Sequence, residues 1–306
     1  MSTKLNQLAE FGQSIWLDYI SRSLIDSGRL KSMIDQGLRG MTSNPTIFDK
    51  AVSSATDYDV SIQQLKEKGK SIFDIYDAIT IKDIQDAADT LKPVYEQTRG
   101  LDGYVSLEIN PKLAYKIEET IQEGMRLHAA VNRPNVMFKV PSTEEGFHAT
   151  TALIAKGINV NVTLIFSLQQ YIKTAKAYLD GMTMLLQRRG NARTVRSVAS
   201  IFVSRIDTAT DDILEAKMGK DTSRNTRLEK LKGTAAVANA AIIYKKYLDT
   251  FSSAEFTQLQ QNGANVQRVL WGSTSTKNPA YSDIKYVSEL IAKGTVNTVP
   301  EKTINA

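Results

Sequence analysis

Eight short β-branched or apolar runs alternate with longer segments of helical periodicity along the chain, which predicts an α/β protein with a parallel sheet. Eight is the strand number that closes a (β/α)8 barrel of the TIM type. The length of 306 residues would also suit two average domains, but no linker or repeat divides the chain, so we expect one barrel domain over 1–306. The runs are Ser14–Ile20, Leu38–Thr42, Gly103–Ile109, Asn135–Val140, Asn159–Phe166, Ser197–Ile206, Val266–Ser273 and Thr295–Val299.

The segments between these runs carry apolar residues at helical spacing. Asn110 and Pro111 supply a cap and a first helical position, and Leu113, Ile117, Ile121 and Met125 follow as an expected buried stripe. Ser167 and Gln170 form a capping box that opens a helix over Leu168–Arg188. Further outer helices are expected at Gly233–Asp249 and Tyr281–Ile291. The segment Lys217–Lys232 is rich in basic residues, but acidic residues interrupt it, so we interpret it as a solvated connection and not as a ligand-binding patch.

Composition excludes several classes of protein and of chemistry. Apolar residues make up 42% and charged residues 23%, so the chain can bury a core. The net charge of +5 does not imply a nucleic-acid partner, and no apolar run is long enough to span a membrane. The absence of Cys removes thiolate, disulfide and iron–sulfur chemistry, and only two His remain. We therefore expect a soluble, unexported, cytoplasmic protein whose chemistry uses lysine and carboxylates.

Lys139 is the most unusual residue, because it lies inside the apolar strand run NVMFKVPST. Burial disfavours an ammonium ion, so a lysine held there is more often a neutral amine that can attack a carbonyl. The chemistry this predicts is a Schiff base. The alternative is a lysine near a strand end whose ammonium group reaches water, and this run alone does not decide between them.

Two carboxylates stand at the ends of other apolar runs, Glu108 in GYVSLEINP and Asp18 in SIWLDYIS. Each alone could be a helix cap or a salt-bridge partner. Together with Lys139 they would meet at the C-terminal face, where barrel enzymes place their chemistry. Imine formation and carbon–carbon cleavage are two proton-transfer tasks, and two carboxylates match them.

Polar side chains follow the same strand ends, and we interpret them as lining a site for a polyhydroxylated, phosphorylated substrate. Buried amides and hydroxyls need partners, which backbone groups could also supply. Two cations are candidate phosphate contacts, with ordinary surface residues as the alternative. The amides and hydroxyls are Asn44, Asn161, Thr163 and Ser200, and the cations are Arg205 and Lys277.

These segments resemble those of the transaldolase family over essentially the whole chain. MTSNPTIF is similar to the family's Thr-Ser/Thr-Asn-Pro signature, and NVMFKVPSTEEG to the signature around its Schiff-base lysine. INVNVTLIF and SVASIFVSRID match the strands that follow, and LWGSTSTKNPAYSD with TVNTVP resembles the longer bacterial subgroup. The resemblance implies a barrel of the class I aldolase kind, whose chemistry needs no metal or organic cofactor.

The resemblance also implies a role for each candidate residue. Lys139 would form the imine with sedoheptulose 7-phosphate or fructose 6-phosphate, and glyceraldehyde 3-phosphate or erythrose 4-phosphate would accept the three-carbon unit, within the pentose phosphate pathway. Glu108, through a water held with Thr163, would move protons at the imine, and Asp18 would exchange a proton during carbon–carbon cleavage. Asn44, Asn161 and Ser200 would hold the dihydroxyacetone unit, with Arg205 on the phosphate and Phe202 beside it.

The chain departs from this family at two places. Many relatives place an arginine after the seventh strand, whereas only Lys277 is offered here. Longer relatives continue beyond the eighth strand, whereas only Glu301–Ala306 follow Pro300. We therefore expect the final outer helix to be missing, so that the outer side of Thr295–Val299 meets water, the N-terminal helix or another chain, with reduced stability or association as a consequence.

Two other functions remain open at this stage. A fructose-6-phosphate aldolase would share the fold and the lysine but release free dihydroxyacetone. A non-catalytic barrel would only bind sugar phosphate or a protein partner. The oligomeric state is also left open, between a monomer and a homo-oligomer.

Overall fold

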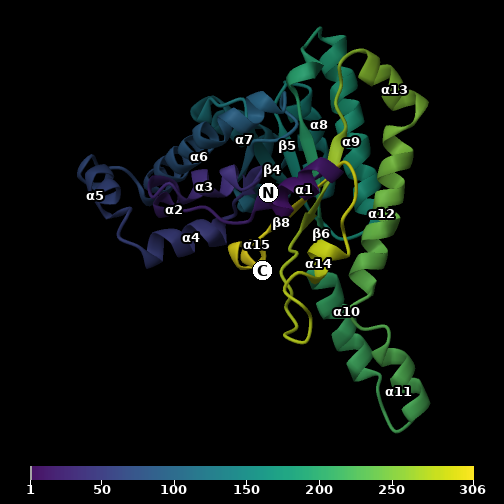
Figure 1. Ribbon diagram of the computed structural model, residues 1–306. Coiled ribbons are helices and arrows are strands. Elements are labelled where there is room, and N and C mark those ends of the chain that lie inside the picture. The colour runs from purple at the N-terminus through teal and green to yellow at the C-terminus, as the bar shows by residue number, and fades with distance from the viewer. Residues whose placement is uncertain (1) are drawn as a thin grey trace.

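The computed structural model describes residues 2–306, which form a closed ring of eight parallel strands in sequence order, β1 to β8, surrounded by helices (Figure 1). The predicted (β/α)8 barrel is therefore confirmed. The strands are β1 (Gln13–Leu17), β2 (Gly40–Thr42), β3 (Tyr104–Glu108), β4 (Val136–Pro141), β5 (Val160–Ile165), β6 (Ser197–Phe202), β7 (Gln267–Gly272) and β8 (Thr295–Val299).

Long amphipathic helices cover the outside of the ring, and short helices lie in its connections. The helices are α1 (Lys4–Phe11), α2 (Arg22–Asp26), α3 (Arg29–Asp35), α4 (Pro45–Ser54), α5 (Asp59–Glu67), α6 (Ile72–Gln97), α7 (Ile117–Val131), α8 (Glu144–Ile154), α9 (Leu168–Gln187), α10 (Ser204–Ala216), α11 (Thr222–Glu229), α12 (Ala235–Phe251), α13 (Ala254–Gln261), α14 (Lys285–Ser288) and α15 (Glu301–Asn305). Two 3₁₀ turns lie at Pro111–Leu113 and Ala192–Thr194. Among residues 2–306, no helix combines the length and apolar character needed to cross a bilayer.

The barrel has two apolar layers, one between strands and helices and one inside the ring. Inside the ring, a small apolar cluster that includes Trp16, Tyr104 and Leu270 fills the half nearer the N-terminal ends of the strands. At the N-terminal mouth Arg268 is buried with Asp102 (Nη1 to Oδ1, 2.9 Å), and the Ser14 hydroxyl donates to the same carboxylate over 2.7 Å. Because this end is filled and neutralised by its own residues, the open end of the barrel is the opposite one.

Several sequence expectations about the helices need correction. The sixth run ends at Phe202, because Ser204 already begins α10. The stripe expected after Pro111 is confirmed only in part: a 3₁₀ turn precedes α7 and Ile121 packs half-buried against the core, but Met125 is exposed. The fully buried residues of α7 are Thr120, Gly124, Leu127 and Val131. Because an α-helix has 3.6 residues per turn, a spacing of four drifts around the axis, and the stripe has left the buried side at Met125.

Two further segments differ from expectation. Only α14 is helical within Tyr281–Ile291, since the rest is turn and coil. The segment Lys217–Lys232 is largely exposed, as expected, but contains α11, which with α10 extends away from the barrel (Figure 1).

All five residues of β8 are buried, so its outer side does not meet water. The outward side chains bond to the connection that precedes the strand: the Thr295 hydroxyl donates to the Ala292 carbonyl (2.6 Å), and the Asn297 amide donates to the Tyr286 carbonyl (3.2 Å). The β7–β8 connection therefore covers the outer side of β8. This cover was not anticipated from the sequence. Reduced stability or association was expected because the outer side of β8 would lack a covering helix. Since that side is buried, the structure gives no support for this expectation.

Candidate active site

A cavity of about 690 Å³ opens at the C-terminal ends of the strands. Its lining contains every site residue expected from the sequence, contributed by seven of the eight strands or the segments that follow them. These residues are Asp18, Asn44, Glu108, Lys139, Asn161, Thr163, Ser200, Phe202, Arg205 and Lys277. The structure therefore brings them together in one place, while their individual roles remain predictions.

Lys139 projects into this cavity from the middle of the ring, and the residue is only 7% exposed. Its Nζ lies 3.2 Å from the Glu108 carboxylate and donates to the Ser43 carbonyl over 3.1 Å. The pairing of β3 with β4 places Glu108 directly beside Lys139 in register, so backbone geometry fixes this contact. The sequence alternative, in which the ammonium group reaches bulk water, is not what the structure shows.

Asp18 follows β1 and is held from the other side of the mouth. The Thr42 hydroxyl donates to its Oδ1 over 2.8 Å, and the same hydroxyl lies 2.7 Å from that of Thr298. The Asp18 backbone N–H continues the ladder by donating to the Val299 carbonyl. Among residues 2–306, this carboxylate has no cation within ion-pair distance.

Asn161 and Ser200 form a buried polar chain across the cavity floor. The Ser200 hydroxyl donates to Asn161 Oδ1 over 2.6 Å, and Asn161 Nδ2 donates to the Ser106 hydroxyl over 3.1 Å. The register of β4 with β5 sets Asn161 beside Lys139. Because these groups are satisfied by one another, they are pre-oriented with hydroxyl and amide groups on the cavity wall.

Thr163 lies next to a break in regular pairing between β5 and β6. The register shifts between Val162 and Ile165, and Leu164 has φ +63°, in the left-handed region. Bulges of this kind re-aim neighbouring side chains. Thr163 itself is buried, and Leu164 joins it in the cavity wall.

The rim of the cavity carries cations and an aromatic platform. The Arg205 guanidinium lies 5.4 Å from the Phe202 ring centroid, and Phe202 contacts Phe166. The exposed Lys277 donates to the Ser275 hydroxyl over 2.7 Å. Asn44 serves two purposes, since its Oδ1 caps α4 by accepting the Ile47 N–H while the residue also lines the cavity.

A second cavity of about 270 Å³ shares Glu108 with the first. Tyr76 borders it, and burial together with the negative charge of Glu108 raises the pKa of this phenol. Glu108 thus stands between a polar cavity and a largely apolar one.

Sequence reasoning missed several residues that line the main cavity, among them Thr42, Lys50 and Thr298. Thr42 ends a strand in the motif MTSNPTIF, so its position could have drawn attention. Lys50 lies in the second turn of α4, where no strand end marks it. Within residues 2–306 no group of three or more His, Asp or Glu side chains is arranged to hold a metal ion.

The chain is similar to known proteins over nearly its whole length. Residues 15–306 match the family described as "Transaldolase/Fructose-6-phosphate aldolase". The chain belongs to this family. A transaldolase of Trichodesmium erythraeum (strain IMS101) is 47% identical over all of this chain and 81% of its own length.

Other transaldolases show the same extent of similarity. Transaldolase 2 of Nostoc sp. (strain PCC 7120 / SAG 25.82 / UTEX 2576) is 45% identical over 99% of this chain and 80% of its own length. The transaldolase of Thermobifida fusca (strain YX) is 46% identical over all of this chain and 82% of its own length. The bacterial transaldolase type expected from the sequence motifs is thereby confirmed.

Proposed function

We propose that this barrel, acting as one domain, is a transaldolase that moves a dihydroxyacetone unit from a ketose phosphate to an aldose phosphate through an imine on Lys139. Donors would be sedoheptulose 7-phosphate or fructose 6-phosphate, and acceptors glyceraldehyde 3-phosphate or erythrose 4-phosphate. The observation that carries the proposal is the buried amine of Lys139, 3.2 Å from Glu108, at the floor of a polar cavity. The setting would be the pentose phosphate pathway in the cytoplasm.

The first half of the reaction uses the Lys139–Glu108 pair. Glu108 takes a proton from the ammonium group, and the neutral amine attacks the ketone carbon to form a carbinolamine. Glu108 returns that proton to the carbinolamine hydroxyl, which leaves as water, and an iminium ion remains. A water held by Thr163 and Glu108 would relay these protons.

The second half uses Asp18. Its carboxylate takes the proton of the C4 hydroxyl as the C3–C4 bond breaks, and the bonding electrons move into the iminium group to form an enamine. The aldose phosphate departs, and the enamine carbon attacks the acceptor aldehyde while Asp18 returns the proton to the new hydroxyl. Water then hydrolyses the iminium ion with Glu108 as base, which restores the free amine.

The remaining lining residues would bind the substrate. Asn44, Asn161 and Ser200 offer amide and hydroxyl groups to the hydroxyls of the dihydroxyacetone unit. Arg205 would hold the phosphate with a two-pronged guanidinium, supported by Phe202, and Lys277 would add a single positive charge. No step requires a metal or an organic cofactor.

A fructose-6-phosphate aldolase remains a second candidate because the matched family includes that activity in its description. Such an enzyme would protonate the enamine and release free dihydroxyacetone. The relatives named transaldolase at 45–47% identity favour transfer to an acceptor. If the protein releases dihydroxyacetone from fructose 6-phosphate as fast without an acceptor aldehyde as with one, it acts as the aldolase.

The test of the proposal is borohydride reduction in the presence of fructose 6-phosphate, followed by peptide mass mapping. A three-carbon adduct should appear on Lys139 and be absent from Lys139→Ala. Lys139→Arg should also be inactive, because a guanidinium keeps its proton. An active protein without an adduct on Lys139, or a folded wild-type protein that consumes no substrate, would refute the proposal.

A further inference from the structure

Residues 45–67, which we call the α4–α5 lobe, leave the barrel after β2 and return to it at α6. The lobe has its own small apolar cluster, in which Ala51 and Tyr58 pack with Ile79 of α6. Its first turns line the main cavity through Pro45, Thr46, Ile47 and Lys50. The position of the lobe therefore decides where these four residues stand at the mouth.

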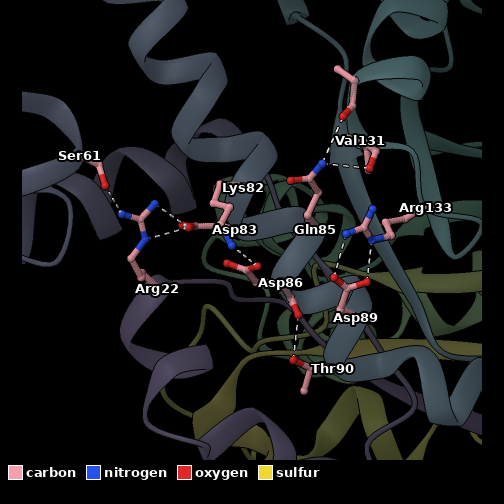
Figure 2. Close-up of polar contacts among 11 residues, drawn as sticks. Arg22, Ser61, Lys82, Asp83, Gln85, Asp86, Asp89, Thr90, Val131 and Arg133 are labelled. Carbon is pink, nitrogen blue, oxygen red and sulfur yellow. Dashed lines mark hydrogen bonds and ion pairs between the residues drawn. The ribbon is translucent and has the colours of Figure 1, made fainter. Parts of the chain in front are cut away.

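The side chain of Arg22, which lies outside the lobe, anchors the lobe through contacts with Ser61 and Tyr58. Arg22, four residues after Asp18, donates from Nη1 to the Ser61 hydroxyl over 2.9 Å, and its guanidinium lies 4.5 Å from the Tyr58 ring centroid. The backbone N–H of Arg22 donates to the Tyr58 hydroxyl over 3.0 Å. Figure 2 shows Arg22 reaching from its own element to Ser61 on one side and to Asp83 on the other.

Asp83 supplies the fixed end of this network. It is 1% exposed and accepts hydrogen bonds from Arg22 (Nε 3.1 Å and Nη2 3.0 Å) and from the Tyr58 hydroxyl (2.7 Å). The α6 helix that carries Asp83 is itself anchored to the end of α7, since Gln85 donates to the Val131 carbonyl and Arg133 binds Asp89 through two nitrogens (Figure 2). A buried, fully bonded carboxylate on an anchored helix is a precise support for the lobe.

Lys50 is the only cation that the lobe places in the cavity lining, and its side chain is exposed. Among residues 2–306 it has no acid within ion-pair distance, whereas the exposed Lys31 of α3 and Lys82 and Lys92 of α6 each have an acid one turn away. β2 and β6 lie four positions apart in the ring of eight, so α4 and α10 flank the mouth from opposite sides (Figure 1). Lys50 thus faces the mouth across from Arg205.

We propose that Lys50 binds the phosphate of the aldose phosphate from the side opposite Arg205, and that Arg22, Asp83 and Tyr58 are positioning residues that hold it there. The inference rests on the proposed function, because it assumes a substrate whose reacting carbon is at Lys139 and whose phosphate lies toward the mouth. A doubly charged phosphate near a cation without a competing acid gains both a charge-assisted contact and faster capture. An unphosphorylated aldose gains neither.

The first experiment compares erythrose 4-phosphate with erythrose as acceptor, with fructose 6-phosphate as donor. Lys50→Gln should lower the ratio of the two kcat/KM values about three- to tenfold, as expected for one partly exposed charge contact. Lys220→Gln removes the same charge from the exposed connection between α10 and α11 and should leave the ratio unchanged. An unchanged ratio in Lys50→Gln would overturn the assignment.

The second experiment tests positioning by a double-mutant cycle. Arg22→Gln and the milder Tyr58→Phe should each lower the same ratio in the wild-type background and have no further effect on it in the Lys50→Gln background. A purely structural role would lower the melting temperature or reduce both kcat/KM values alike, with the ratio intact, and that result would overturn the positioning role. Equal effects in both backgrounds would overturn it too.

These outcomes are separable from failure of the proposed function. If the wild-type protein transfers no three-carbon unit to either acceptor, the transaldolase proposal fails first. If transfer occurs and borohydride labels Lys139, the ratio alone decides the role of Lys50.

Discussion

Substitution of Glu108 by Gln tests the proton relay with the smallest change in shape. The side chain ends β3 beside Lys139, and its Oε2 lies 3.2 Å from Nζ. A glutamine amide keeps the length and one hydrogen-bond acceptor but cannot take the ammonium proton or return it to the carbinolamine hydroxyl. The fold should survive, because Lys139 keeps its bond to the Ser43 carbonyl and the Glu108 side chain is 20% exposed.

The size of the effect follows from the task that the carboxylate performs. General acid–base catalysis by a positioned side chain contributes about 10²- to 10⁴-fold, which corresponds to about 2.7 to 5.5 kcal/mol of activation free energy. We expect kcat for transfer from fructose 6-phosphate to fall within this range in Glu108→Gln. The loss should lie in imine formation, so borohydride trapping in a single turnover should slow by the same factor.

The matched control is Glu118→Gln, which makes the same change at an exposed position of α7. Its activity and its rate of trapping should equal those of the wild type. Two results would refute the reasoning. One is a fall in kcat of less than about tenfold in Glu108→Gln, which is below the range for general acid–base catalysis; the other is a large fall in kcat while imine trapping keeps its normal rate.

The remaining predictions concern stability and backbone geometry. Asp102→Ala leaves the buried guanidinium of Arg268 without its counter-charge, which should cost about 3–5 kcal/mol and lower the melting temperature by about 5–8 °C in a scanning calorimeter. Gly146→Ala would place a Cβ 1.9 Å from the Pro141 carbonyl oxygen, so the start of α8 must move away from the end of β4; urea unfolding should show a loss of about 1–3 kcal/mol or more. Leu164→Gly removes a left-handed leucine that is 37% exposed, so its unfolding free energy should stay within about 1 kcal/mol of wild type.

Controls for the Asp102 and Leu164 variants are available in the same chain. Asp180→Ala breaks an exposed pair with Lys176 on α9 and should change stability by less than about 1 kcal/mol. Leu153→Ala truncates a fully buried leucine of α8 and should cost about 2–5 kcal/mol, well above the effect at Leu164. If Asp102→Ala is no more destabilising than Asp180→Ala, or Leu164→Gly is as destabilising as Leu153→Ala, the corresponding argument is wrong.

The strand positions could be predicted from the sequence because strands buried on both faces are continuous apolar runs, a strictly local signal. Polar residues at the ends of such runs, for example Glu108 and Asn161, could be predicted as neighbours because parallel strands end at the same edge. The helices were less predictable. In α7 the true buried side contains Thr120 and Gly124, and these residues do not stand out in an apolar pattern.

The sequence by itself determined the order of eight strands, the family motifs and the set of polar residues that meet in the cavity, since each depends on residues close together in the chain. Tertiary structure alone decided which groups touch: Glu108 beside Lys139, the cover of β8 by the β7–β8 connection, and Arg22 joined to Asp83 and Tyr58. These contacts join residues 11 to 61 positions apart. Their existence depends on strand register and on the path of connecting segments, which no local pattern of residue types encodes.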